Sequence, residues 1–159
     1  MKKFGLVVIG AHFGVWLNDE LSRFDKENIL LVEPVPYNHN KLKERFVNSN
    51  NIQICTNAIF SENKISKFYY VNEKSIPKLG KHWASGIGSF NKNHILDHRT
   101  KRFKIEEDDI DEIEIEFITF EDLIRNYAIK SIDKLQIDVE GAEYEILKSI
   151  DYKKININS

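Results

Sequence analysis

The sequence predicts a doubly wound α/β domain with a mostly parallel central sheet. An apolar run at residues 6–9 breaks at Gly10 and is followed at once by a helical pattern. A second unit of this kind lies near the C-terminus, where a strand-like run at residues 134–138 leads through Gly141 into another helix. A β-branched run without alternation is typical of a strand buried on both faces. Strand, glycine turn and helix begin a doubly wound sheet, whose ligands bind beyond the carboxyl ends of the strands.

The composition is that of one domain with a substantial core. The chain has 159 residues, 42% of them hydrophobic, and a net charge of −2. This charge argues against electrostatic binding to nucleic acid or to an anionic membrane. The single cysteine, Cys55, excludes an internal disulfide and is expected to be a small core residue. No stretch resembles a signal peptide or a membrane span, so we expect a soluble, cytoplasmic domain that binds neither nucleic acid nor membrane.

The first strand, residues 6–9, ends at a turn that contains Gly10 and Gly14. Gly10 permits a tight turn, Gly14 permits a close backbone approach, and the start of the next helix offers free N–H groups. The helix is predicted from an apolar stripe with three- and four-residue steps. The stripe consists of Phe13, Trp16, Leu17, Leu21 and Phe24. This unit alone suggests a site for a nucleotide-like cofactor.

The second strand begins at Asn28 and ends in Glu33, which follows Gly10 by 23 residues. This is close to the ~20-residue spacing at which an acid reaches the ribose hydroxyls of a cofactor. A carboxylate can accept two hydrogen bonds from a vicinal diol. The alternative is an ordinary strand-end acid in solvent, but the glycine turn that precedes Glu33 favours the ribose role.

Less regular elements follow the second strand. Residues 38–48 are consistent with a short surface helix, residues 51–59 with a third strand, and residues 67–71 with a further strand. Asn57, near the end of the third strand, either contacts the edge of an adenine ring or serves as a turn residue. Residues 72–104 resemble a long irregular insertion, which in a compact domain is usually functional or mobile.

Within this insertion, residues 82–89 are a candidate lid or substrate-facing loop. Three of the five histidines, His82, His94 and His98, also lie in it. They lack the spacing to nearby acids that metal ligands show, so we predict no metal site. The acid-rich run at residues 106–116 is expected to form a solvated face.

Residues 114–118 alternate as a half-exposed strand does, and Thr119 then begins a helix. Asp122 stands three residues after Thr119, as in a capping box, and Ile118 can pack on Leu123 as a hydrophobic staple. The buried stripe of this helix is predicted to be Phe120, Leu123, Ile124 and Tyr127.

The second glycine unit carries three acids. Asp138 ends its strand, Glu140 precedes Gly141, and Glu143 begins the next helix. Like charges this close cost free energy unless a cation, a proton or ligand groups compensate them, so the cluster is a candidate site. We predict a site role for Asp138 and Glu140. Glu143 fits equally a site or a first helical turn, where the helix dipole favours an acid.

Four or five strands of the sheet are readable before the sequence stops at Ser159. A doubly wound domain ordinarily continues with more strands. We therefore expect residues 1–159 to form a single domain that lacks its C-terminal strands or is completed by another chain. Such a sheet would expose a hydrophobic edge.

Together these segments resemble the FkbM-type S-adenosylmethionine-dependent methyltransferase family. They occur in the family's order and cover nearly the whole chain, and the last of them is the most specific. The matching segments are residues 9–14, 32–36, 56–59, 86–90, 118–123 and 135–143.

The resemblance implies a class I methyltransferase fold, S-adenosylmethionine as cofactor, and O-methylation of a hydroxyl on a small-molecule or glycan acceptor such as a sugar or natural product. The implied cofactor-binding residues are Gly10, Ala11 and Gly14 at the methionine half, Glu33 at the ribose, and Asn57 with Ala58 at the adenine; Pro34 is also counted among them. Asp138 would face the methionine end and the acceptor. The implied catalytic residues are Asp138 together with a base for the hydroxyl proton, for which Glu140, His12 and His82 are the candidates.

Two departures from the family pattern keep alternatives open. In the first glycine turn, Val8 stands where the family usually has an acid, and His12 stands where it usually has asparagine. Second, the family domain normally continues into further strands after the helix that follows residues 135–143. Val8 and the early stop favour a truncated or degenerate copy without turnover. A nicotinamide dinucleotide-binding oxidoreductase is less favoured, because its fingerprint Gly-x-Gly-x-x-Gly requires glycine where His12 stands.

Overall fold

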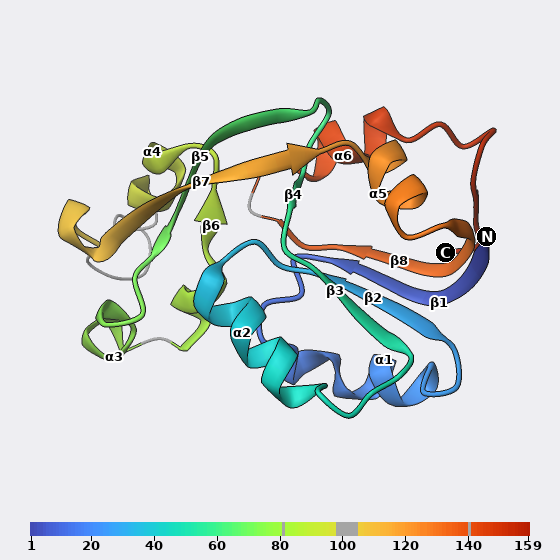
Figure 1. The fold of residues 1–159 in the computed structure, drawn as a ribbon. Helices are drawn as coiled ribbons and strands as arrows, with labels where there is room; N and C mark the ends of the chain where they lie inside the picture. Colours follow the sequence, from blue (N-terminus) through green and yellow to red (C-terminus); the bar gives the residue numbers. More distant parts are fainter. Residues whose placement is uncertain (81, 98–104, 140) are drawn as a thin grey trace.

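The computed structural model describes residues 1–80, 82–97, 105–139 and 141–159. Its first sheet has the strand order β3-β2-β1-β8-β9, and all neighbouring pairs are parallel. The strands are β1 (Lys2–Ile9), β2 (Asn28–Val32), β3 (Ile52–Cys55), β8 (Ile129–Ile137) and β9 (Asn156–Ile157). This parallel sheet with its helices confirms the predicted α/β, Rossmann-like fold (Figure 1).

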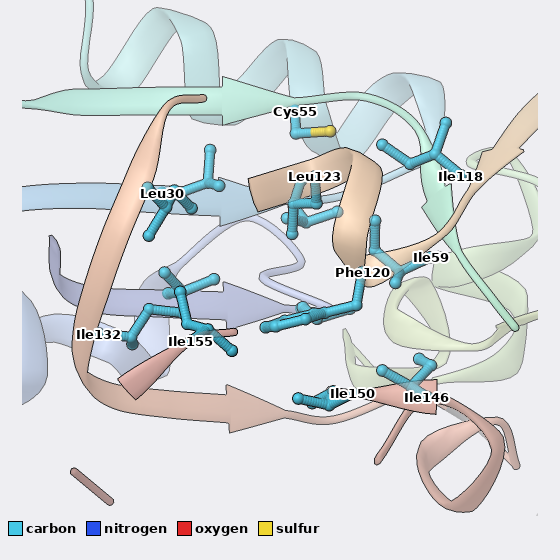
Figure 2. Packing of buried hydrophobic residues seen from close by; sticks show 14 of the residues in the cluster. Leu30, Cys55, Ile59, Ile118, Phe120, Leu123, Ile132, Ile146, Ile150 and Ile155 are labelled. Atoms are coloured by element: carbon cyan, nitrogen blue, oxygen red, sulfur yellow. The ribbon is translucent and has the colours of Figure 1, made fainter. Parts of the chain in front are cut away.

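Helices cover both faces of the first sheet. Successive residues of a buried strand point to opposite faces, so each strand contributes side chains to two core clusters. Val7 and Ile9 belong to the core cluster beneath α5 and α6, whereas Leu6 and Val8 belong to the cluster beneath α1 and α2. Figure 2 shows the first cluster, in which Phe120 of α5 lies among side chains of the sheet. The helices are α1 (Asn18–Arg23), α2 (Pro36–Arg45), α5 (Phe120–Asn126) and α6 (Glu143–Ser149).

The first helix begins later than the sequence predicts. A 3₁₀ turn, η1 (Val15–Leu17), precedes α1, and this tighter turn changes which side chains face the sheet. Leu17 and Leu21 are buried as predicted, but Trp16 is 47% exposed. The prediction that Trp16 belongs to the buried stripe is therefore wrong.

A second sheet follows β3, with the order β4-β7-β5-β6. Its strands are β4 (Ala58–Ile59), β5 (Lys64–Val71), β6 (Gly88–Ser89) and β7 (Ile110–Ile118). β4 and β7 are parallel, while β5 pairs antiparallel with both β6 and β7. The predicted single strand at residues 51–59 is thus two strands in two sheets. The break lies at Thr56 and Asn57, where Asn57 Nδ2 donates to the Glu116 carbonyl oxygen of β7 at 3.3 Å.

The described part of the expected irregular insertion is largely ordered structure. It contains α3 (Ser75–Leu79), η2 (His82–Gly86), β6 and α4 (Lys92–Asp97). Apolar side chains from these short elements, among them Ala84 and Ile95, form a core cluster together with Val71 of β5. Each element is too short for its hydrophobic period to be visible in the sequence.

The acid-rich run is only partly a solvated face. Asp109, in the 3₁₀ turn η4 (Glu107–Asp109), is 2% exposed and accepts hydrogen bonds from Ser75 and Lys78. Burial alone would raise the pKa of Asp109, but these hydrogen bonds and one from the Glu106 N–H leave it below its ordinary value. In the described part of the chain no helix is long and apolar enough to cross a membrane.

Candidate active site

The turn after β1 brings the backbone of the first strand against that of β8. Gly10 has φ 87°, and the N–H groups of Gly10 and Ala11 both donate to the Val32 carbonyl oxygen at 2.9 Å. A Cβ atom on Gly10 would lie 1.9 Å from the carbonyl oxygen of Asp138. Only glycine fits here, because both the backbone conformation and the close approach exclude a side chain.

Glu33 holds this turn to the start of α2. Its Oε2 accepts the N–H of His12 and its Oε1 accepts the N–H of Val35, both at 2.8 Å. The side chain is 5% exposed. Burial raises the pKa of Glu33 to about 7, although the hydrogen bonds from Val35, His12 and Asn38 act in the opposite direction. Glu33 is therefore not an ordinary strand-end acid in solvent.

His12 is buried between the glycine turn and η2. Its φ of 54° is left-handed, which asparagine, aspartate and histidine adopt more readily than other residues with side chains. The ring is 2% exposed, stacks on Trp16 at 4.5 Å, and is hydrogen-bonded through Nε2 to Ser85 Oγ. The Ser85 carbonyl oxygen in turn accepts a hydrogen bond from Asn38 Nδ2 at 2.7 Å. These bonds fix η2 over the glycine turn.

The acids after β8 separate into different positions. The Asp138 N–H donates to the Ile9 carbonyl oxygen at 2.9 Å, and its side chain is exposed. The Glu143 carboxylate accepts the N–H groups of Val139 at 3.2 Å and Gly141 at 3.1 Å. Glu143 therefore stabilises the turn, as the helix-start alternative predicts. Glu140 lies outside the described residues.

Two adjoining pockets open at the carboxyl ends of the parallel strands. The apolar pocket is lined by Val35, Ala58 and Ile59, among others. Four phenylalanines of the second sheet and its loops also line it and are called the phenylalanine wall: Phe60, Phe68, Phe90 and Phe117. The polar pocket is lined by Gly10, His12, Trp16, Glu33, Gly86, Gln136 and Asp138. The pockets share Gly10, Glu33, Gly86 and Asp138, so they form one cleft.

The structure brings most of the predicted site residues to this cleft. Gly10, Glu33 and Asp138 line both pockets, His12 lines the polar pocket, and Pro34, Asn57 and Ala58 line the apolar pocket. Asn57 also donates to the Glu116 carboxylate at 3.0 Å. Ala11 and Gly14 line neither pocket: Ala11 is fully buried in the core, and the Gly14 N–H donates to the Ala11 carbonyl oxygen. The side chain of His82 lies outside what the structure describes, as does His98.

Sequence reasoning missed several residues that the fold brings to the cleft. Gln136 follows the strand pattern of β8 and carried no separate signal, and the phenylalanine wall comes from distant segments. Beside the cleft, His94 of α4 lies against the turn after β8, since a Cβ atom on Gly141 would be 3.4 Å from the His94 Cε1. Among the described residues no group of three histidine, cysteine or acidic side chains could hold a metal ion.

Comparison with known proteins agrees with this architecture. Residues 9–158 match the methyltransferase FkbM domain. The chain belongs to the FkbM methyltransferase family. The match includes both glycine turns and the whole second sheet, so the FkbM domain spans the cleft and its phenylalanine wall. Membership in the FkbM family supports a methyltransferase function. Neither the search of curated proteins nor that of solved structures found a match.

Proposed function

We propose that this FkbM methyltransferase uses S-adenosylmethionine as methyl donor and methylates a hydroxyl of a sugar or another small natural product. The observation that carries the proposal is the cleft at the carboxyl ends of β1, β2 and β8, in which an apolar and a polar pocket meet at Gly10 and Glu33. Doubly wound sheets bind nucleotides at the carboxyl ends of their strands.

The residues present fit the donor in three parts. The apolar pocket, with Val35, Ala58 and Phe60, suits the faces of an adenine ring. Glu33 suits the ribose diol, because each of its oxygens accepts one backbone N–H and a carboxylate oxygen can accept a second hydrogen bond. The turn at Gly10, where the two pockets meet, suits the amino-acid end.

The bound donor would supply a methyl group on a positively charged sulfur, and the chain would contribute mainly position and proton acceptance. Asp138 is the candidate acceptor for the hydroxyl proton, because its exposed carboxylate lines both pockets. His12 is the second candidate, but its ring is 2% exposed and bonded to Ser85. We therefore propose that Asp138 contacts the acceptor hydroxyl and that His12 stabilises the glycine turn.

Calorimetric titration with S-adenosylhomocysteine, with NAD as a parallel ligand, tests the donor class. We expect saturable binding of S-adenosylhomocysteine alone. Binding of NAD alone would support a dinucleotide-dependent oxidoreductase, and binding of neither ligand to the folded chain would support a degenerate domain without turnover.

Glu33→Ala tests the placement of the ribose. We expect the affinity for S-adenosylhomocysteine to fall by ~1–3 kcal/mol, because the bound hydroxyls lose a charged acceptor. Glu44→Ala is the matched control, since Glu44 is an exposed acid of α2 that lines neither pocket. Equal affinities of the two variants would remove the ribose assignment.

A further inference from the structure

Trp16 presents an exposed aromatic face inside an otherwise polar pocket. Its side chain is 47% exposed and lines the polar pocket beside Gly10 and His12. The indole is held in place because it stacks on the buried ring of His12, with 4.5 Å between ring centroids and 21° between the ring planes. An aromatic surface that is held rigid and left open to solvent is typical of a binding surface.

Hydrogen-bonding groups line the same pocket. Gln136 and Asp138 lie two residues apart at the end of β8, so their side chains leave the strand on the same face. Gln136 is in register with Val8 of β1, and Asp138 follows the strand at the level of Gly10. The pocket therefore offers an amide and a carboxylate together with the Trp16 indole.

The charge of the cleft restricts what it can bind. Glu33 and Asp138 line both pockets, and neither pocket includes a lysine or arginine among the described residues. The nearest lysine on this face of β8, Lys134, is paired with Glu20 at 2.7 Å. In the polar pocket, a phosphorylated or carboxylated acceptor would meet the carboxylates of Glu33 and Asp138.

We propose that Trp16 is the platform on which the acceptor binds, and that the polar pocket selects a neutral, hydroxyl-rich ring such as a pyranose over an anionic acceptor. The apolar C–H face of the ring packs on the indole, and its hydroxyls donate to Asp138 and Gln136. This inference rests on the proposed methyltransferase function and names the acceptor class of the same site.

Transfer of radiolabelled methyl from S-adenosylmethionine to a panel of acceptors tests the proposal. The neutral probes are the methyl pyranosides of glucose, galactose, mannose and fucose; the charged probes are glucose 6-phosphate, galacturonate and tyramine. We expect transfer to at least one neutral probe and none to the anionic probes. Trp16→Ala should raise the KM for the neutral acceptor at least tenfold, and Trp16→Phe should bring the KM most of the way back to the wild-type value. Tyr152→Ala is the control: Tyr152 is an exposed aromatic residue outside both pockets, so this variant should leave the KM unchanged.

Binding of S-adenosylhomocysteine to each variant separates this inference from the proposed function. We expect the Kd of Trp16→Ala to stay within twofold of wild type. A loss of donor affinity with an unchanged acceptor KM would overturn the platform and place Trp16 at the donor. Transfer only to anionic probes or tyramine, or to none of the probes by a chain that binds S-adenosylhomocysteine, would also overturn it. If the wild-type chain does not bind S-adenosylhomocysteine, the proposed function itself fails.

Discussion

At the scale of single residues, Gly10 has the least freedom to change. We expect Gly10→Ala to lower the free energy of unfolding by about 3 kcal/mol or more and to abolish binding of S-adenosylhomocysteine. Left-handed backbone costs a non-glycine residue about 1–2 kcal/mol, and the new Cβ would in addition lie 1.9 Å from the Asp138 carbonyl oxygen.

Gly80→Ala is the matched control for this substitution. Gly80 also has a left-handed φ, 64°, but no atom of the residues that the structure describes lies within 4 Å of a Cβ built there. Urea unfolding should therefore show a loss of only about 1–2 kcal/mol, from the backbone alone. Equal losses at the two glycines would show that the contact between the β1 turn and Asp138 contributes nothing.

The raised pKa of Glu33 predicts a pH dependence of stability. The folded pKa, about 7, lies above the ordinary value of 4.5, so the folded state holds a proton that the unfolded state releases. This contribution is fully present below pH 4.5 and is lost as the pH rises through about 7, in total about 3 kcal/mol. Unfolding of the wild type and of Glu33→Gln from pH 4.5 to 8 measures it. Parallel profiles of the two proteins would contradict the assignment.

The same group predicts a pH dependence of binding. Ribose hydroxyls donate hydrogen bonds, so they favour the ionised form of Glu33 over the protonated form. We expect the affinity for S-adenosylhomocysteine to rise roughly tenfold between pH 6 and pH 8, as a group with a pKa of about 7 ionises. Calorimetric titration at both pH values measures this change, and the Glu33→Gln variant should show much less of it.

Glu33 also illustrates what the sequence predicts at this scale. Its position could be inferred from its spacing to Gly10, because strand lengths in such units vary little. Its hydrogen bonds to the N–H groups of His12 and Val35 could not, since they depend on how the turn and α2 approach each other. The same is true of the bond between His12 and Ser85, which joins residues 73 positions apart.

At the scale of elements, the cap of α5 gives a direct test. Thr119 Oγ1 accepts the N–H of Asp122 at 3.1 Å and donates to its carboxylate. We expect Thr119→Ala to lower the free energy of unfolding by about 1 kcal/mol, the usual contribution of such a cap. Thr119→Ser retains the hydroxyl and should remain close to wild type in urea unfolding. A serine variant as unstable as the alanine variant would show that packing of the threonine methyl, and not capping, is responsible.

Elements with a clear period were predictable and the short ones were not. The strands β1 and β2 contain unbroken apolar runs, β8 alternates toward its end, and α5 shows both a stripe and a capping signal. By contrast, α3 (Ser75–Leu79) and α4 (Lys92–Asp97) have only five and six residues, too few for a repeat to be recognised, and the sequence predicted no start signal for either. The break between β3 and β4 was missed because only Thr56 and Asn57 separate them, while the change of partner strand leaves no mark in the sequence.

At the scale of the whole molecule, the two sheets meet at the apolar pocket. Phe117 is 2% exposed and packs with Phe68, whereas Phe90 is 43% exposed at the same pocket. We expect Phe117→Ala to cost about 3–5 kcal/mol of stability because it leaves a cavity. Phe90→Ala should preserve stability and weaken S-adenosylhomocysteine binding. Thermal unfolding and calorimetry on both variants separate the two effects, and equal destabilisation by both would contradict this division.

The phenylalanine wall could not be predicted from the sequence. Its members come from β5, from β7 and from the residues after β4 and β6, and each looks locally like an ordinary apolar residue. The pairing of β5 with β7 and β6 joins these segments in the second sheet, which lies beside the first sheet (Figure 1).

One feature of this topology bears on how the protein can change over generations. Ala58 of β4 and Phe117 of β7 are direct neighbours in register, so the segment between them leaves and returns at one place. Insertions with adjacent ends can be exchanged or resized with little effect on the scaffold that carries them. The layer that bears Gly10, Glu33 and Asp138 can thus be inherited intact while the inserted segment diverges. Trp16, Gln136 and Asp138 lie outside this segment, whereas Phe60, Phe68 and Phe90 lie inside it. Divergence of the segment would therefore reshape the apolar pocket and leave the Trp16 platform in place.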